Sequence, residues 1–372
     1  MQNRQYIPII IILLVSLLVL FLINSCNKSE QKISKKFDMI KLNDIVLKES
    51  NNMLIGECKK IHIDKNDKLY YADKSQQQII IFDRLGNIIK KIGRYGDGPE
   101  DLSNIVDFDV IDENIFIFHK GGLRVSTFKN SGELINTFTF DLENNILPYG
   151  SALVANKMSQ IIITERTYKG NMDNFSLEKF ITNTYLLGKY DIYGKPLGKI
   201  GNYSSRIINS KKFAPVFIKM PLFCIDSKDN IFLISSCKLP IVQKFDKDGF
   251  FIREIDLQSS LFKSVFDMAD MEQSYLSSFF YYIKYIEKKH KIFALFGNRE
   301  KEPDQTNKKS LSFFLIVWDE VTNSLSQPIE LIQYASKAPK IDVDMNGVIY
   351  VLTDDTPENI TITKYALACQ EK

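Results

Sequence analysis

Arginine, tyrosine and aspartate side chains placed between repeated segments have the chemistry best suited to binding a ligand. Only 8 of the 48 basic residues are arginine, and the rigid guanidinium recognises carboxylates through two parallel hydrogen bonds. Residues 93–100 read Gly-Arg-Tyr-Gly-Asp-Gly-Pro-Glu directly after a predicted strand. We predict a site for an anionic or hydroxyl-rich ligand, such as an acidic glycan, formed by Arg94, Tyr95, Asp97, Arg124, Arg166 and Arg206. The alternative is that these side chains are solvated charges or structural hydrogen-bond donors.

Catalytic metal and covalent catalysis find little support in the sequence. The histidines His62, His119 and His290 occupy dissimilar positions, and the cysteines form no CxxC pair, so no metal or other cofactor is predicted. Residues 342–347 begin like a calcium-binding loop, but the twelfth position is Thr353 instead of glutamate, which favours a hairpin turn. No G-x-S-x-G sequence is present. Paired carboxylates of the kind that hydrolyse glycosides remain an open alternative.

The elements that must position these side chains are short strands that recur along the chain. Each recurring segment is an apolar run that ends in an aromatic residue and a polar turn, and the intervals between these aromatics run from 46 to 73 residues. Repeats of this length are typical of propeller blades. The aromatic residues are Phe82, Phe128, Tyr190, Phe245, Trp318 and Tyr365. We predict an all-β, six-bladed β-propeller of four-stranded antiparallel blades.

The ring is predicted to close through the N-terminal part of the domain. The third strand of blade six runs over residues 361–368, and only four residues follow it. An incomplete blade would expose an unpaired strand edge. Residues 37–47 have the composition of a strand and are expected to complete this blade.

The domain is expected to span residues 37–372, with insertions near 165–183, 258–290 and 297–310. The second of these is rich in aromatic residues, and a short helix is predicted in it before a strand at 279–286. Aromatic residues in such an insertion stack on sugar rings or, more commonly, pack it against the domain. Blades three and five are therefore expected to depart from the regular pattern.

The N-terminus has the features of a bacterial lipoprotein signal. Arg4 precedes an apolar run over residues 7–23, and Asn24, Ser25 and Cys26 follow it. We predict a signal peptide over residues 1–25, a lipid on Cys26 that attaches the protein to a membrane, and a flexible polar tether over residues 26–36. The alternative is an uncleaved signal anchor. The expected location is the cell envelope, on the periplasmic or cell-surface side of an outer membrane.

Composition narrows the class of partner. The 372 residues are 45% hydrophobic and 25% charged, with a formal net charge of +3, so nucleic acid is not an expected partner. The remaining cysteines are Cys58, Cys224, Cys237 and Cys369. Free buried thiols are favoured for them over a disulfide.

The sequence around residues 93–100, beside the repeated Asp-x-x-Gly turns and the lipoprotein signal, resembles the six-bladed, NHL-like β-propeller lipoproteins of Bacteroidetes. The resemblance covers roughly residues 37–368. It implies a secreted, lipid-anchored propeller, and the wider NHL group includes a zinc-dependent lyase as well as many ligand-binding and protein-interaction modules.

Two classes of function follow for this chain. The first is a non-enzymatic module that binds a glycan, peptide or partner protein at the mouth of the propeller channel. The second is a lyase or hydrolase that acts on a polysaccharide or peptide at the same place. An enzyme needs an acid and a base with shifted pKa values within reach of one pocket.

Overall fold

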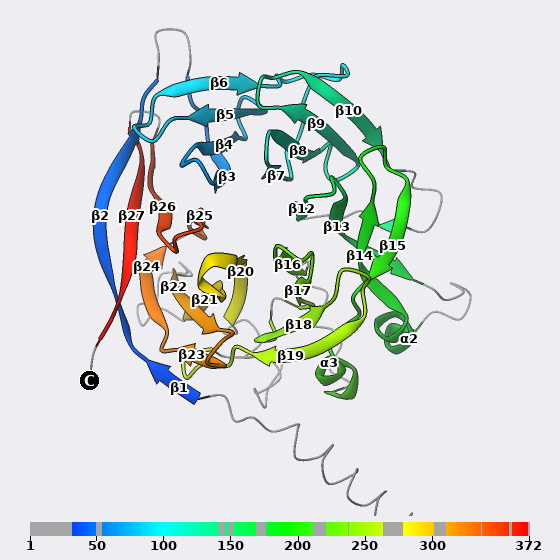
Figure 1. Ribbon diagram of the computed structural model, residues 1–372, viewed down its shortest axis with the longest axis vertical. Helices are drawn as coiled ribbons and strands as arrows, with labels where there is room; N and C mark the ends of the chain where they lie inside the picture. The colour runs from blue at the N-terminus through cyan, green and yellow to red at the C-terminus, as the bar shows by residue number, and fades with distance from the viewer. Residues whose placement is uncertain are drawn as a thin grey trace, which may run out of the picture.

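The computed structural model describes residues 32–49, 54–140, 146–147, 152–168, 176–210, 221–236, 238–262, 278–300, 310–335, 337–356 and 359–370. Its strands form six sheets around a central axis, antiparallel apart from one parallel pair in the fifth sheet (Figure 1). The predicted six-bladed β-propeller is confirmed.

Three blades follow the simple four-strand pattern. Blade one contains β3 (Cys58–Ile63), β4 (Leu69–Asp73), β5 (Gln78–Phe82) and β6 (Ile88–Ile92). Blade two contains β7 (Asp107–Ile111), β8 (Asn114–His119), β9 (Arg124–Lys129) and β10 (Leu134–Thr139). Blade four contains β16 (Leu222–Ile225), β17 (Ile231–Ile234), β18 (Ile241–Phe245) and β19 (Phe251–Asp256).

Blades three and five carry additional elements. Blade three contains β11 (Ile146–Leu147), β12 (Leu153–Ala155), β13 (Ile161–Tyr168), β14 (Thr184–Tyr190) and β15 (Pro196–Ile200). Helix α2 (Leu177–Thr182) precedes β14, and α3 (Ser205–Ser210) follows β15. Blade five contains β20 (Ser278–Ile286), the 3-10 turn η5 (Glu287–Lys289), β21 (Lys291–Glu300), β22 (Ser310–Asp319), β23 (Ser324–Ser326) and β24 (Ile329–Ala335).

Blade six is completed by a strand from the start of the domain, as the sequence predicts. β25 (Ile341–Val343), β26 (Ile349–Thr356) and β27 (Asn359–Cys369) are followed in the sheet by β2 (Phe37–Leu47). The pairing of β2 with β27 is antiparallel and runs from Phe37 opposite Cys369 to Leu47 opposite Ile360. Figure 1 shows the two strands side by side at the outer edge of the ring.

The structure differs from the expected boundaries in two places. Lys32–Lys35, within the expected flexible tether, form strand β1, which pairs in parallel with β23 of blade five. Ser278–Ile286, within the expected insertion 258–290, is the innermost strand of blade five and pairs with β21. The polar composition of residues 32–35 hides the first of these strands, whereas the second is predicted as a strand over 279–286 but assigned to an insertion. Residues 263–277, with the predicted short helix, and residues 301–309 lie outside the described residues.

The tight turns have the predicted chemistry. In blade one the Asp83 carboxylate accepts hydrogen bonds from the backbone nitrogens of Leu85 and Asn87 at 2.8 and 2.9 Å. Gly86 has a φ of 81°, which glycine adopts without steric cost. Asp344 accepts in the same way from Asn346 and Val348, so residues 342–347 form the predicted hairpin turn.

The strand order places two kinds of connection on opposite faces of the ring. The tight turns after the first and third strands of a blade lie on one face, which we call the turn face. The connections after the second and fourth strands lie on the other, the connection face. The linker 93–106, α2 and α3 all lie on the connection face.

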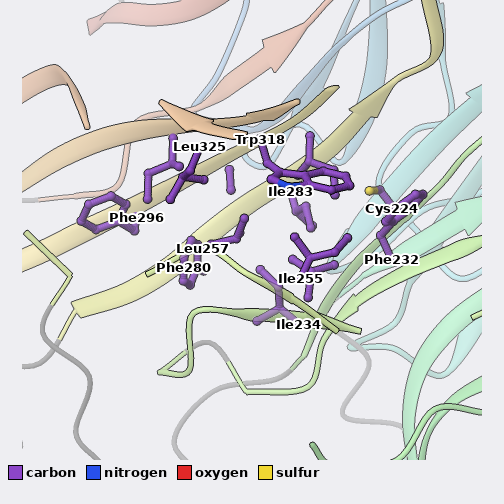
Figure 2. Close-up of a cluster of buried hydrophobic side chains, with 14 of the residues drawn as sticks. Cys224, Phe232, Ile234, Ile255, Leu257, Phe280, Ile283, Phe296, Trp318 and Leu325 are labelled. Atoms are coloured by element: carbon purple, nitrogen blue, oxygen red, sulfur yellow. The ribbon is translucent and has the colours of Figure 1, made fainter. Parts of the chain in front are cut away.

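Hydrophobic clusters fill the interfaces between neighbouring blades. The cluster between blades four and five includes Phe232 from β17, Phe296 from β21 and Trp318 from β22, all buried (Figure 2). Phe82, Phe128, Tyr190 and Phe245 are buried in other interfaces. Five of the six recurring aromatic residues are therefore core, and the sixth, Tyr365, is partly buried against the cluster between blades five and six.

Candidate functional site

The inner strands of all six blades line one cavity of about 570 Å³ on the axis of the propeller. These strands are β3, β7, β12, β16, β20 and β25, which surround the centre of the ring in Figure 1. Residues 338–340 precede β25 and also line the cavity, so it reaches the connection face. Its volume lies in the range of small-molecule sites.

One half of the cavity carries charged side chains that join blades one and two. The Lys60 ammonium on β3 donates to the Asp107 carboxylate on β7 at 2.7 Å and to the carbonyl of Phe108 at 2.8 Å. Burial disfavours the ammonium, but the charges of Asp107 and Asp109 raise the pKa of Lys60 above its usual value. Asp107 also accepts from the backbone nitrogen of Leu153 in blade three at 2.7 Å. The carboxylate thus links three blades.

The Asp342 carboxylate likewise links three blades, namely blades five, six and one. Its carboxylate accepts from Tyr282 Oη at 2.8 Å, from Lys284 Nζ at 2.6 Å and from the backbone nitrogen of Ile63 at 2.7 Å. Burial alone would raise the pKa of Asp342, but Lys284, His62 and these hydrogen bonds lower it. Burial and the Asp342 charge raise the pKa of Tyr282 well above its usual value. Asp342 is therefore an anion at neutral pH and Tyr282 a neutral donor.

Two further titratable groups face the same cavity. Burial raises the pKa of Asp109 to about 6, and its carboxylate accepts from the backbone nitrogen of Ala155 at 2.9 Å. Burial lowers the pKa of His62 to about 3, although its Nδ1 lies 3.6 Å from the Asp342 carboxylate. His62 is therefore neutral in the physiological range, and Asp109 changes its charge close to neutral pH.

The opposite half of the cavity is apolar. It is formed by the inner strands of blades three and four, with β20 of blade five beside them. The side chains include those of Ala152, Val154, Leu222, Cys224, Ile225 and Ile283. A ligand in this cavity meets charge on one side and hydrocarbon on the other.

Two lysines stand at the connection-face rim of the cavity. Lys59 lies at the start of β3 and Lys340 directly before β25, and both line the cavity. Burial lowers the pKa of Lys340, and the charge of Lys59 acts in the same direction. Within the described residues neither ammonium lies within 4.0 Å of a carboxylate.

The linker 93–106 brings four of the predicted site residues together, away from the cavity lining. Arg94 Nε donates to the Asp101 carboxylate at 2.7 Å, with the arginine side chain 81% exposed. Tyr95 is 76% exposed, and Asp97 pairs with Lys120 at 3.0 Å. Arg124 is buried beneath this linker, with Nη2 3.5 Å from the carbonyl of Pro99 and without a hydrogen-bond partner for Nε among the described residues.

The other predicted site residues lie apart from that group. Arg206, in α3, pairs with Asp256 at 3.3 Å beside blade four. Arg166 is in β13, where its backbone pairs with Leu147. Cys26 lies outside the described residues. None of Arg94, Tyr95, Asp97, Arg124 and Arg206 lines the central cavity, so their role in ligand binding stays a prediction.

A second, larger hollow of about 1270 Å³ runs along the outer strand of blade four. It is lined by β19, by the connection that follows β15, and by Asn323 and Leu325 of blade five. Two of its charged side chains are paired with residues outside the lining, Arg253 with Glu320 at 3.2 Å and Asp256 with Arg206 at 3.3 Å. We favour the central cavity because six separate strands converge there and because its titratable groups have shifted pKa values.

No cluster of three or more histidine, cysteine, aspartate or glutamate side chains suited to a metal ion occurs among the described residues. Cys58 and Cys224 are free and buried, Cys369 is free and exposed, and Cys237 lies outside the described residues. In the described part of the chain, no helix is long and apolar enough to cross a membrane.

Sequence reasoning missed the charged residues of the cavity, although a signal for them exists. Lys60 and His62, Asp107 and Asp109, and Tyr282 and Lys284 each stand two positions apart on strands that are otherwise buried. Residues at this spacing point to the same side of a strand. Polar pairs at period two on a predicted inner strand therefore indicate the channel lining.

Comparisons with known proteins agree with the fold. Residues 21–187 match the family model described as DUF5128, 6-bladed beta-propeller. A crystal structure of a duf4221 family member from Bacteroides vulgatus has a TM-score of 0.66 and 13% identity, covering 91% of this chain and 100% of that one. A putative exported protein from Bacteroides fragilis has a TM-score of 0.58 and 10% identity, covering 92% and 98%. No curated protein sequence matches the chain.

These matches and the six sheets agree with the resemblance stated from the sequence. The chain folds as a six-bladed β-propeller, and residues 21–187 match the model of the DUF5128 family.

Proposed function

We propose that the protein is a ligand-binding module whose central cavity receives part of a glycan or peptide. The observation that carries the proposal is the cavity of about 570 Å³ that the six inner strands enclose, charged on one side and apolar on the other. Such an arrangement orients a ligand that has both polar and apolar groups.

Binding is tested with the full-length chain in detergent against arrays of glycans and peptides. A Val154→Trp variant places an indole ring in the apolar half of the cavity and is expected to abolish binding. Leu197→Trp places the same ring on the outer strand β15, where Leu197 is 45% exposed, and is expected to bind like the parent chain. If Val154→Trp binds as well as the parent, the ligand does not occupy the cavity.

A second candidate function is acid–base catalysis on the same ligand. Asp109 favours it, because a carboxyl group with a pKa of about 6 exchanges protons near neutral pH. The reaction would be elimination or hydrolysis of a polysaccharide or peptide. Release of products by the parent chain and not by Asp109→Asn, with ligand affinity retained, would establish catalysis; binding without product release would establish the non-enzymatic module.

The membrane anchor is a separate part of the proposal. It rests on Cys26 after the apolar run 7–23, and the similarity to a putative exported protein supports an extracytoplasmic location. Strand β1 starts six residues after Cys26, and six extended residues span only about 20 Å. The expected product is a protein with a lipid on Cys26 that fractionates with membranes, whereas Cys26→Ser is released. Mass spectrometry of the N-terminal peptide would contradict the anchor if Cys26 were unmodified.

A further inference from the structure

The carboxylates near the rim of the cavity are already bound to other donors. Glu57 Oε2 pairs with Lys74 at 2.9 Å, and its Oε1 lies 3.7 Å from Lys337. Asp355 accepts from Tyr71 Oη at 3.2 Å and from the backbone nitrogen of Cys58 at 3.4 Å. Neither carboxylate is therefore fully available to the rim lysines.

The carboxylates inside the cavity are committed in the same way. Asp107 is bonded to Lys60, and Asp342 to Lys284 and Tyr282. Asp109 accepts from a backbone nitrogen of the next blade. Lys59 and Lys340 are thus left without an ion-pair partner among the described residues, although both line the cavity.

Two neighbouring cations in a partly buried place are unfavourable for the protein by itself. Lys59 lies in β3 of blade one and Lys340 directly before β25 of blade six, and these two inner strands contact each other. Burial lowers the pKa of Lys340, and the positive charge of Lys59 adds to this effect. An anion between them removes the repulsion and accepts charge-assisted hydrogen bonds from both ammonium groups.

The apolar half of the cavity lies within reach of the same ligand. Ala152 directly precedes the inner strand of blade three and Leu222 begins that of blade four, and both line the cavity on that half. Inner strands of all blades run in the same direction along the axis, so these residues and Lys59 share one level near the connection face. The rim therefore offers positive charge on one side and hydrocarbon on the other.

Resting on the function proposed above, we propose that the cavity takes a ligand with an anionic group on an apolar body, with the anion bound between Lys59 and Lys340. The apolar body lies against the inner strands of blades three and four. A carboxylate of this kind occurs in an acidic sugar with an apolar substituent and at the C-terminus of an apolar peptide.

Two pairs of probes distinguish these sources. Phenyl β-glucuronide and phenyl β-glucoside differ in a carboxylate, and so do N-acetyl-leucyl-phenylalanine and its C-terminal amide. Titration calorimetry on the full-length chain in detergent, with probes up to millimolar concentration, is expected to show at least tenfold tighter binding of the acid in one pair, because charge-assisted hydrogen bonds of this kind contribute about 1.5–3 kcal/mol. The pair that shows the preference identifies the source.

The decisive variant is the double change Lys59→Gln with Lys340→Gln. It is expected to remove the preference for the acid while leaving binding of the neutral probe unchanged. Both side chains are partly exposed and have no ion-pair partner among the described residues, so the fold is expected to survive, and a thermal melt checks this. The matched control is Lys65→Gln with Lys129→Gln, two exposed lysines outside the cavity, which changes the net charge equally and is expected to keep the preference.

Each remaining outcome overturns one of the two proposals. Equal affinity for acid and neutral probes, with loss of both in Val154→Trp, overturns the anion site and leaves the ligand-binding function standing. A preference that survives the double variant also overturns the anion site. No binding of any of the four probes overturns the proposed function itself.

Discussion

The Asp342 carboxylate in blade six accepts a hydrogen bond of 2.7 Å from the backbone nitrogen of Ile63 in blade one. The two residues are 279 positions apart, and this bond closes the ring at the inner strands. Strand β2 closes the same ring at the outer edge. Blade six is therefore fastened to the beginning of the domain on both sides.

Removing the Asp342 carboxylate should destabilise the protein strongly. Asp342→Ala leaves the buried Ile63 N–H and the Lys284 ammonium without their acceptor, and breaking a buried pair in this way typically costs about 3–5 kcal/mol. Chemical denaturation measures the loss. Asp97→Ala removes a carboxylate that is 89% exposed and is expected to change stability by no more than about 0.5 kcal/mol. Equal effects of the two substitutions would contradict the role given to Asp342.

Closure by β2 predicts different effects for two isoleucines on the same strand. Ile45 is 6% exposed and packs between blades six and one, whereas Ile40 is 50% exposed. Ile45→Ala should cost about 2–4 kcal/mol, and Ile40→Ala about 0.5 kcal/mol or less. Deletion of residues 37–47 should sharply lower the melting temperature; an unchanged melt would contradict closure by this strand.

Buried neutral histidines predict loss of stability in acid. Burial lowers the pKa of both His62 and His119 from 6.5 to about 3. As the pH falls, the unfolded chain therefore binds these protons before the folded chain does. The contribution of each neutral histidine to stability is complete above pH 6.5. It is lost as the pH falls towards 3, at about 1.4 kcal/mol of unfolding free energy per pH unit for each histidine. His62→Gln should weaken this pH dependence. His290→Asn, at an exposed turn position, should leave it unchanged in acid-denaturation curves.

The Asp109 carboxyl group predicts a pH dependence of stability that is opposite in sign to that of the histidines. Its folded pKa of about 6 lies above the unfolded value of 3.8, so the group stabilises the fold below pH 3.8 and loses this contribution as the pH rises through 6. Asp109→Asn should therefore raise stability at pH 7 by roughly 3 kcal/mol at most, and the gain should vanish near pH 4. Denaturation at the two pH values measures it. A loss of stability at pH 7 would show that the carboxylate charge is needed for the fold.

Replacement by alanine is expected to have different effects on stability at two glycines, because only one of them has a close backbone neighbour. A Cβ on Gly86 would lie 2.2 Å from the carbonyl oxygen of Val46 in β2, at a φ of 81°. Gly86→Ala should cost more than about 1 kcal/mol. A Cβ on Gly198 meets nothing within 4 Å, so Gly198→Ala should be neutral or slightly stabilising. Thermal melts of the two variants provide the comparison.

Much of the ring follows from local sequence. The Asp-x-x-Gly turns require hydrogen bonds within five residues and a positive φ at glycine, and both depend on neighbouring residues only. The same local patterns predict the four strands of blades one, two and four. They miss β1, a short lysine-rich edge strand, and they predict the strand of β20 but assign it to an insertion instead of to the inner edge of blade five.

The sequence by itself determined that this chain forms six repeated sheets and that residues 37–47 complete the last one. Only the tertiary structure decided which side chains meet on the axis. Lys60, Asp107 and Asp342 belong to different blades, and their contacts depend on the order and curvature of the whole ring. For the same reason Arg94 and Asp97 follow a predicted strand but lie on an outer linker. Spacing along a chain specifies turns, whereas closure of a ring brings together residues that no spacing relates.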